Sequence, residues 1–140
     1  MGRKSTEKTR KPLSPKMEIW LDDLIPAIAG KNLSSLTIDD LAIITKKSKS
    51  TIYEYFKSKQ EIIYAAVKRR ISKLDDLPKP SETESVLFTY NALIEWLIKH
   101  LNDISFSFLN QLEQNFEHSW KLINEFMNRL LKTLKNLYKQ

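Results

Sequence analysis

Lysines, serines, a threonine and tyrosines crowd the stretch KKSKSTIYEYFKSKQE, residues 46–61. Ammonium groups and hydroxyls donate hydrogen bonds to phosphate oxygens, and hydroxyls also pair with the edges of nucleic-acid bases. Ile52 and Phe56 lie four residues apart in the same stretch, so both fall on one face of a helix. The stretch therefore predicts a helix with one buried face and one cationic, hydrogen-bonding face that suits a polyanion.

Capping residues divide this region into short helices. Thr37 followed by Asp40 predicts the start of a helix over residues 38–45, and Ser48 predicts the start of a second over residues 49–57. Two short helices joined by a tight turn, the second with polar groups outward, are typical of a helix-turn-helix. The second helix of this motif enters the major groove of DNA.

A third helix follows at once. Ser58 with Glu61 three residues on predicts a capping box and a helix through about residue 74. Lys57 and Lys59 stand near its N-terminus, where the helix dipole favours a phosphate. The outward residues of the preceding helix, expected to meet phosphates and bases, are Lys49, Ser50, Thr51, Tyr53 and Glu54.

The rest of the chain divides by composition. Residues 1–14 are basic and poor in large apolar groups, which predicts a flexible arm. Ser14 and Pro15 predict a helix start, so that residues 15–59 form a helix-turn-helix domain and residues 60–74 a connecting helix.

Residues 75–85 are acidic and contain proline, which predicts a linker, and residues 86–140 predict three further helices. The expected fold class is all-α.

Charge and composition narrow the function. Residues 1–80 hold 17 Lys and Arg against 10 Asp and Glu, whereas residues 81–140 hold 6 against 7. The basic half is expected to meet a polyanion. The chain has no cysteine, two isolated histidines and no glycine-rich phosphate loop, so we expect no enzymatic activity, cofactor or metal. We expect no membrane partner and a cytoplasmic location, because no segment is apolar for long enough.

The last predicted helix, over about residues 119–138, carries a heptad-like apolar stripe. Its members are Trp120, Ile123, Met127, Leu130, Leu134 and Leu137, spaced by three and four residues. Such a stripe packs either inside the chain or against a second copy. Because only three helices follow the linker, we favour a homodimer interface and keep the intrachain core as the alternative.

Aromatic residues after the linker suggest a candidate pocket for a small-molecule effector. Its lining would include Phe88, Trp96, His100, Phe106 and Phe108. A drug-sized site needs an apolar cavity of roughly 300 Å³ or more. The alternative is that these aromatic side chains only build the core and the dimer interface.

Residues 36–63, LTIDDLAIITKKSKSTIYEYFKSKQEII, resemble the DNA-binding domain of the tetracycline-repressor (TetR) family of bacterial transcriptional regulators. The core of the resemblance is the run from Ser48 to Lys59, preceded at the expected distance by TIDDLA. Weaker agreement extends from about Met17 to Arg70. The resemblance implies a three-helix DNA-binding domain, a connecting helix and an α-helical domain that dimerises and often binds an effector.

The resemblance also implies roles for single residues. Thr37 and Ser48 would cap helices against phosphates, and Tyr53, Tyr55 and Lys59 would contact the DNA backbone. Lys49, Ser50, Thr51 and Glu54 would face bases, while Leu41, Ala42, Ile52 and Phe56 would be core. The family usually has glycine in the turn and then a small apolar residue, where this chain has Lys46 and Lys47. A left-handed lysine costs roughly 1 kcal/mol, and both lysines add positive charge beside the groove.

Together these patterns predict a homodimeric, sequence-specific DNA-binding transcriptional regulator, with repression as the expected action. It would bind a pseudo-palindromic operator in double-stranded DNA through the major groove. The altered turn and the short C-terminal half leave one alternative open. That alternative is a TetR-like adaptor that has lost operator binding and contacts another protein.

Overall fold

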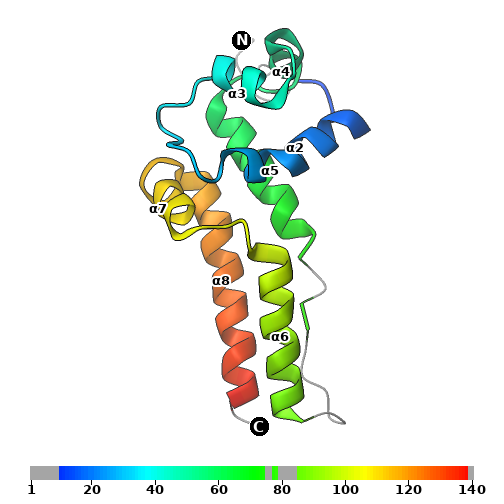
Figure 1. Ribbon diagram of the computed structural model, residues 1–140, viewed down its shortest axis with the longest axis vertical. Coiled ribbons are helices and arrows are strands. Elements are labelled where there is room, and N and C mark those ends of the chain that lie inside the picture. The colour runs from blue at the N-terminus through cyan, green and yellow to red at the C-terminus, as the bar shows by residue number, and fades with distance from the viewer. Residues whose placement is uncertain (1–9, 75–76, 79–84, 139–140) are drawn as a thin grey trace, which may run out of the picture.

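The computed structural model describes residues 10–74, 77–78 and 85–138, with side chains to residue 136. Every regular element in these ranges is a helix, as the sequence predicted (Figure 1). In chain order they are α2 (Pro15–Ile28), α3 (Ile38–Thr45), α4 (Lys49–Tyr55), α5 (Lys59–Ser72), α6 (Val86–Leu101), α7 (Phe106–Asn115) and α8 (Glu117–Tyr138). None of these helices is long and apolar enough to cross a membrane.

Side-chain caps set the helix starts where the sequence predicted them. Ser14, Ser48 and Ser58 each accept a hydrogen bond from the backbone N–H three residues on. Thr37 forms a complete capping box with Asp40. The predicted box of α5 differs in one bond, because the Glu61 carboxylate accepts from the N–H of Lys57 at 2.9 Å instead of that of Ser58.

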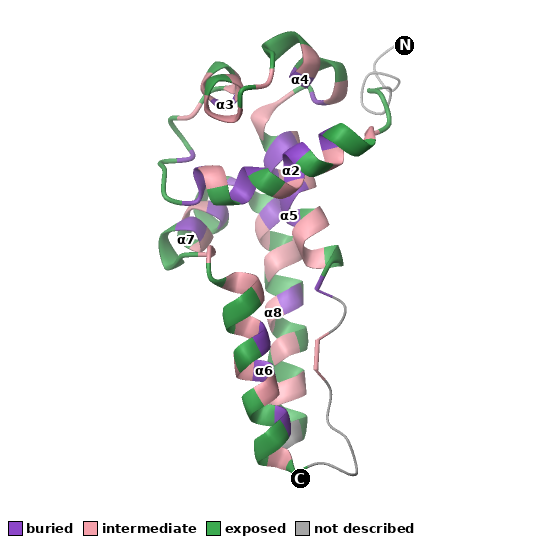
Figure 2. Ribbon diagram, turned by 45° about the vertical axis from the view of Figure 1, so that its right-hand side comes forward, coloured by how far each residue is buried: buried purple, intermediate pink, exposed green. Residues whose placement is uncertain are grey.

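The main core lies where α2, α5, α7 and the helix-turn-helix meet (Figure 2). Leu21 and Leu24 of α2 are fully buried against α5, and Phe108 and Leu112 of α7 close the far side. Ile52 anchors α4 in this core. The helix-turn-helix is therefore held by the same apolar cluster that holds α7 and the start of α8.

Two arginines of α5 reinforce this junction. Arg69 donates two hydrogen bonds to Asp22 of α2, and Arg70 donates two to Asp103 in the connection between α6 and α7. Hydrogen bonds from the guanidinium groups hold the pKa of both carboxyls below the ordinary value. Such bidentate arginine–carboxylate pairs fix the relative orientation of the two side chains in addition to pairing their charges.

The half of the molecule away from the helix-turn-helix, called the lower half below, consists mainly of two helices, α6 and the C-terminal part of α8. Helix α6 packs mainly along α8, through a small cluster formed by Leu74, Trp96 and Phe126 (Figure 1). Large apolar side chains stay exposed on these two helices: Leu87, Phe88, Tyr90 and Ile98 on α6, and Leu131 on α8. This half therefore has apolar surface that the described residues leave exposed.

Part of the apolar stripe of α8 packs inside the chain, and the dimer interface predicted for this stripe stays a prediction. Trp120 and Ile123 pack on the main core, and Leu130 packs on the small lower cluster. Met127 borders a narrow internal cavity, and Leu134 is half-buried. The side chain of Leu137 lies outside the described residues. The members that pack inside the chain do so because the main core and the small cluster offer apolar surface to α8.

Candidate nucleic-acid interface

The turn between α3 and α4 has the geometry of a helix-turn-helix. Lys46 ends α3 in the left-handed conformation, with φ 57° and ψ 40°. Its N–H donates to the carbonyl of Ile43, and the N–H of Lys47 donates to the carbonyl of Ala42 at 3.1 Å. These two bonds form a Schellman motif, in which glycine is the usual left-handed residue. Lys46 thus has the left-handed conformation that the sequence analysis considered for the turn.

Polar side chains gather on the outward side of α4 and its turn. Lys46, Ser48, Lys49, Ser50, Tyr53 and Glu54 are exposed, while Lys47, Thr51 and Tyr55 are half-buried. At the N-terminal end the Ser48 hydroxyl lies 2.7 Å from that of Thr51. Lys49 pairs with Asp39 of α3 at 2.6 Å and lies 5.8 Å from the centre of the Tyr53 ring. The result is a surface of ammonium groups and hydroxyls.

Lys59 points inward, away from the position that the resemblance implies. Its ammonium group donates to the carbonyls of Leu33, Ser34 and Leu36 at 2.8, 3.1 and 2.8 Å. Burial lowers the pKa of Lys59, yet three carbonyls hold the group in place. In this structure Lys59 fixes the loop before α3 instead of reaching outward to a phosphate.

Helix α7 holds the same loop from its other side. The Gln111 side chain accepts from the N–H of Leu33 at 2.6 Å and donates to the carbonyl of Lys31 at 3.1 Å. Asn115 donates to the Ser34 hydroxyl at 3.1 Å. The loop that leads into the helix-turn-helix is thus bound to α5 and to α7. No local sequence pattern indicated this contact, because its partners are about eighty residues apart.

The end of the basic arm lies against the C-terminal end of α4. The N–H of Lys11 donates to the carbonyl of Glu54 at 3.3 Å, and the Lys11 ammonium pairs with the Glu54 carboxylate at 2.6 Å. Arg10 donates to the carbonyl of Tyr53. Residues 1–9 of the predicted arm lie outside the described residues. Cations therefore stand at both ends of α4, and those of the arm were not placed there by the sequence analysis.

The residues predicted for an effector pocket do not surround one cavity. Phe88 and Phe106 are exposed, at 57% and 83%, and Phe108 is buried in the main core. Trp96 is buried with its ring centre 4.9 Å from that of His100. Phe108 does border a cavity between α5, α7 and α8, but its volume of about 80 Å³ is too small for a typical ligand.

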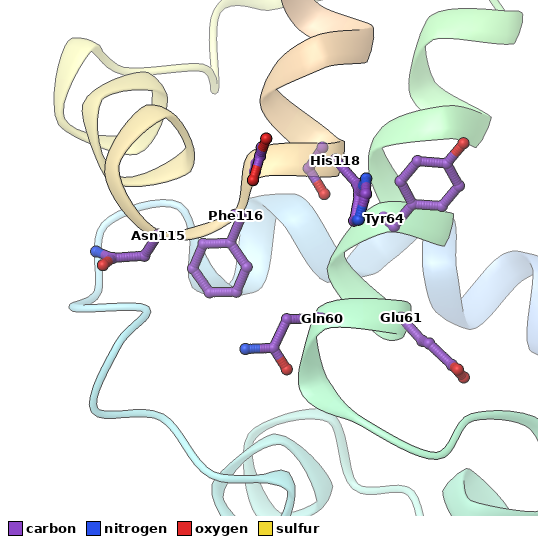
Figure 3. A pocket seen from close by; sticks show the side chains of 8 residues that line it. Gln60, Glu61, Tyr64, Asn115, Phe116 and His118 are labelled. Carbon is purple, nitrogen blue, oxygen red and sulfur yellow. The ribbon is translucent and has the colours of Figure 1, made fainter.

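A larger cleft opens beside the start of α5, where the sequence analysis did not expect one. It measures about 290 Å³ and is lined by Gln60, Glu61 and Tyr64 of α5 and by residues 115–119 at the corner between α7 and α8 (Figure 3). Buried Phe116 forms its floor between those two helices. Within the described part of the chain, no cluster of acidic and histidine side chains could hold a metal ion.

Comparison with known proteins points in the same direction as the geometry. The chain is 25% identical over 96 residues to an uncharacterized HTH-type transcriptional regulator, YvaF of Bacillus subtilis (strain 168). The match covers 66% of this chain, and the chain spans about half the length of that relative. No protein-family model and no solved structure matches the chain. The hydrogen-bonding outward face of α4, the lysines of its turn and this weak similarity together support a DNA-binding regulator of the helix-turn-helix class.

Proposed function

We propose that this protein is a sequence-specific DNA-binding transcriptional regulator of the TetR type, which acts as a repressor. The observation that carries the proposal is the α3–turn–α4 unit, with its Schellman turn at Lys46 and its hydrogen-bonding outward face. A seven-residue helix closed on one side by buried Ile52 leaves the opposite side free for a groove. That arrangement suits insertion of α4 into the major groove.

The proposed interface with DNA contains phosphate contacts and base contacts. Lys46, Lys47 and Tyr53 would hold phosphates, since they stand at the edges of the α4 surface. Ser50 and Thr51 lie on the first turn of α4, where a recognition helix reads base edges. Lys59 has no part in this surface, because its ammonium group is bound to three carbonyls.

The proposal includes a homodimer whose interface differs from the predicted α8 stripe. Leu87 and Ile98 are eleven residues apart, about three helical turns, so they share one face of α6. Both are exposed, at 67% and 64%. A second copy of this face would cover them and would place two α4 helices on successive half-sites, about 34–36 Å apart on the duplex.

A small-molecule effector is best accommodated by the cleft at the start of α5. Glu61 lines this cleft and also accepts the N–H of Lys57, the residue that links α4 to α5. A ligand that engages the Glu61 carboxylate would therefore compete with a bond that fixes the end of the recognition unit. We propose this cleft in place of the pocket that the sequence predicted from Phe88, Trp96, His100, Phe106 and Phe108.

The test is binding of the purified protein to the DNA upstream of its own gene, against unrelated duplex of equal length, across a salt series. We expect a saturable preference for the upstream DNA, with a log–log salt slope of about −0.9 per phosphate contacted. A protein that shows no affinity for any duplex at low salt would contradict the proposal and favour the adaptor. A Tyr53→Ala variant tests the assigned surface, and Phe106→Ala at the exposed start of α7 is its control.

A further inference from the structure

Four contacts join the end of the basic arm to the last turn of α4. Lys11 contributes its N–H to the Glu54 carbonyl and its ammonium group to the Glu54 carboxylate. The same ammonium group lies 5.4 Å from the centre of the Tyr55 ring, and Arg10 donates to the carbonyl of Tyr53. Forty-three residues separate these partners, so the contact is tertiary and not a feature of the local sequence.

The chemistry of a helix end explains the contact. The last carbonyls of α4 have no donors within the helix, and its last turn carries no cation of its own. Arg10 and Lys11 supply the missing donors together with the positive charge that a helix C-terminus favours. The arm thus completes α4 from outside the helix-turn-helix.

The pairing changes what Glu54 can do. A lone carboxylate on this surface would either accept from a cytosine amino group or repel phosphates. Here it holds an ammonium group at 2.6 Å, and its hydrogen bond raises the pKa of Lys11. The pair is about half exposed on both sides, so its lysine still reaches the surface that would face DNA.

We propose that Glu54 is a positioning residue that fixes the arm, through Lys11, beside the recognition helix, and that it does not read a base. Fixed in this way, Arg10 and Lys11 extend the phosphate-binding surface past the C-terminal end of α4. An exposed ion pair alone contributes little to stability, because water screens it. The ordering of the arm rests on the pair and the two backbone bonds together. This inference depends on the proposed DNA-binding function.

Two separate assays measure the release of the arm from α4 and the binding of DNA. Trypsin cleaves the Arg10–Lys11 bond only when the arm leaves α4, whereas the next bond resists because proline follows Lys11. Without DNA, we expect Glu54→Ala to speed this cleavage about threefold while the melting temperature stays unchanged. The matched control is Asp39→Asn, which breaks a pair of the same length at the other end of α4 and should leave cleavage at Arg10 unaltered.

With operator DNA, we expect Glu54→Ala to weaken binding about threefold at low salt without changing the preferred base at any position. Lys11→Met should weaken it further, and the double variant should equal Lys11→Met alone because Glu54 acts through Lys11. Tighter binding by Glu54→Ala, an altered preference at one base pair, or unchanged tryptic cleavage would overturn the inference. If the wild-type protein binds no DNA, the proposed function fails, and the cleavage result still reports whether Glu54 holds the arm.

Discussion

Replacing Lys46 by glycine should separate the stability of the fold from its affinity for DNA. Lys46 occupies the left-handed region, with φ 57°, at a cost of about 1–2 kcal/mol for a residue with a side chain. Glycine removes that cost but adds freedom to the unfolded chain, worth about 0.4–1 kcal/mol. We expect a net gain of about 1 kcal/mol, or about 3–4 °C in melting temperature for a chain of this size.

The affinity of Lys46→Gly for DNA should fall, although its stability rises. Lys46 is exposed at the N-terminal side of α4, and its loss should remove about one phosphate contact, or about 0.9 from the log–log salt slope. Lys46→Ala is the matched control, because alanine loses the same charge and keeps the left-handed strain. Calorimetry and fluorescence anisotropy measure the two effects. The reasoning is refuted if Lys46→Gly is no more stable than Lys46→Ala, or if neither variant changes the salt slope.

Three further predictions test the supports of the site. The hydrogen bond from Arg69 lowers the pKa of Asp22 below 3.8. The ionised carboxylate therefore stabilises the folded protein above pH 3.8, and this contribution is lost as the pH falls through the lower pKa of the folded state. In urea unfolding, Asp22→Asn should have a smaller free energy of unfolding than the wild type at pH 7 and should lose less of it between pH 4 and pH 2. Gln111→Ala should cost about 1–2 kcal/mol in the same assay, because a backbone N–H of the loop before α3 loses its acceptor. Ile98→Glu should turn the proposed dimer into a monomer in sedimentation, whereas Lys99→Glu should not.

Local signals in the sequence located the helix-turn-helix well. A cap and its acceptor lie three residues apart, so Thr37, Ser48 and Ser58 marked their helices without any knowledge of the fold. The turn lysine was identified for the same reason, since the resemblance covers a continuous run of residues. These features depend on neighbours in the chain, and the structure has them where the sequence predicted them.

Contacts between distant segments escaped prediction. The ammonium group of Lys59 binds carbonyls 23 to 26 residues away, and the partner of Lys11 is 43 residues away. Likewise, the spacing of the α8 stripe says that Ile123 and Leu130 are covered, but not whether their cover comes from the same chain. In the structure, Ile123 packs on the main core and Leu130 on the cluster of Leu74, Trp96 and Phe126.

Helix α8 begins in the main core and ends at the far tip of the lower half (Figure 1). Its 22 residues make a rod about 33 Å long, at about 1.5 Å per residue. A tilt of about 5° at one end would displace the other by roughly 3 Å, by the geometry of a rigid helix of that length. A rod of this length would work as a lever: a small tilt where α8 begins, at the corner between α7 and α8, would move the exposed apolar surface of the lower half by roughly 3 Å.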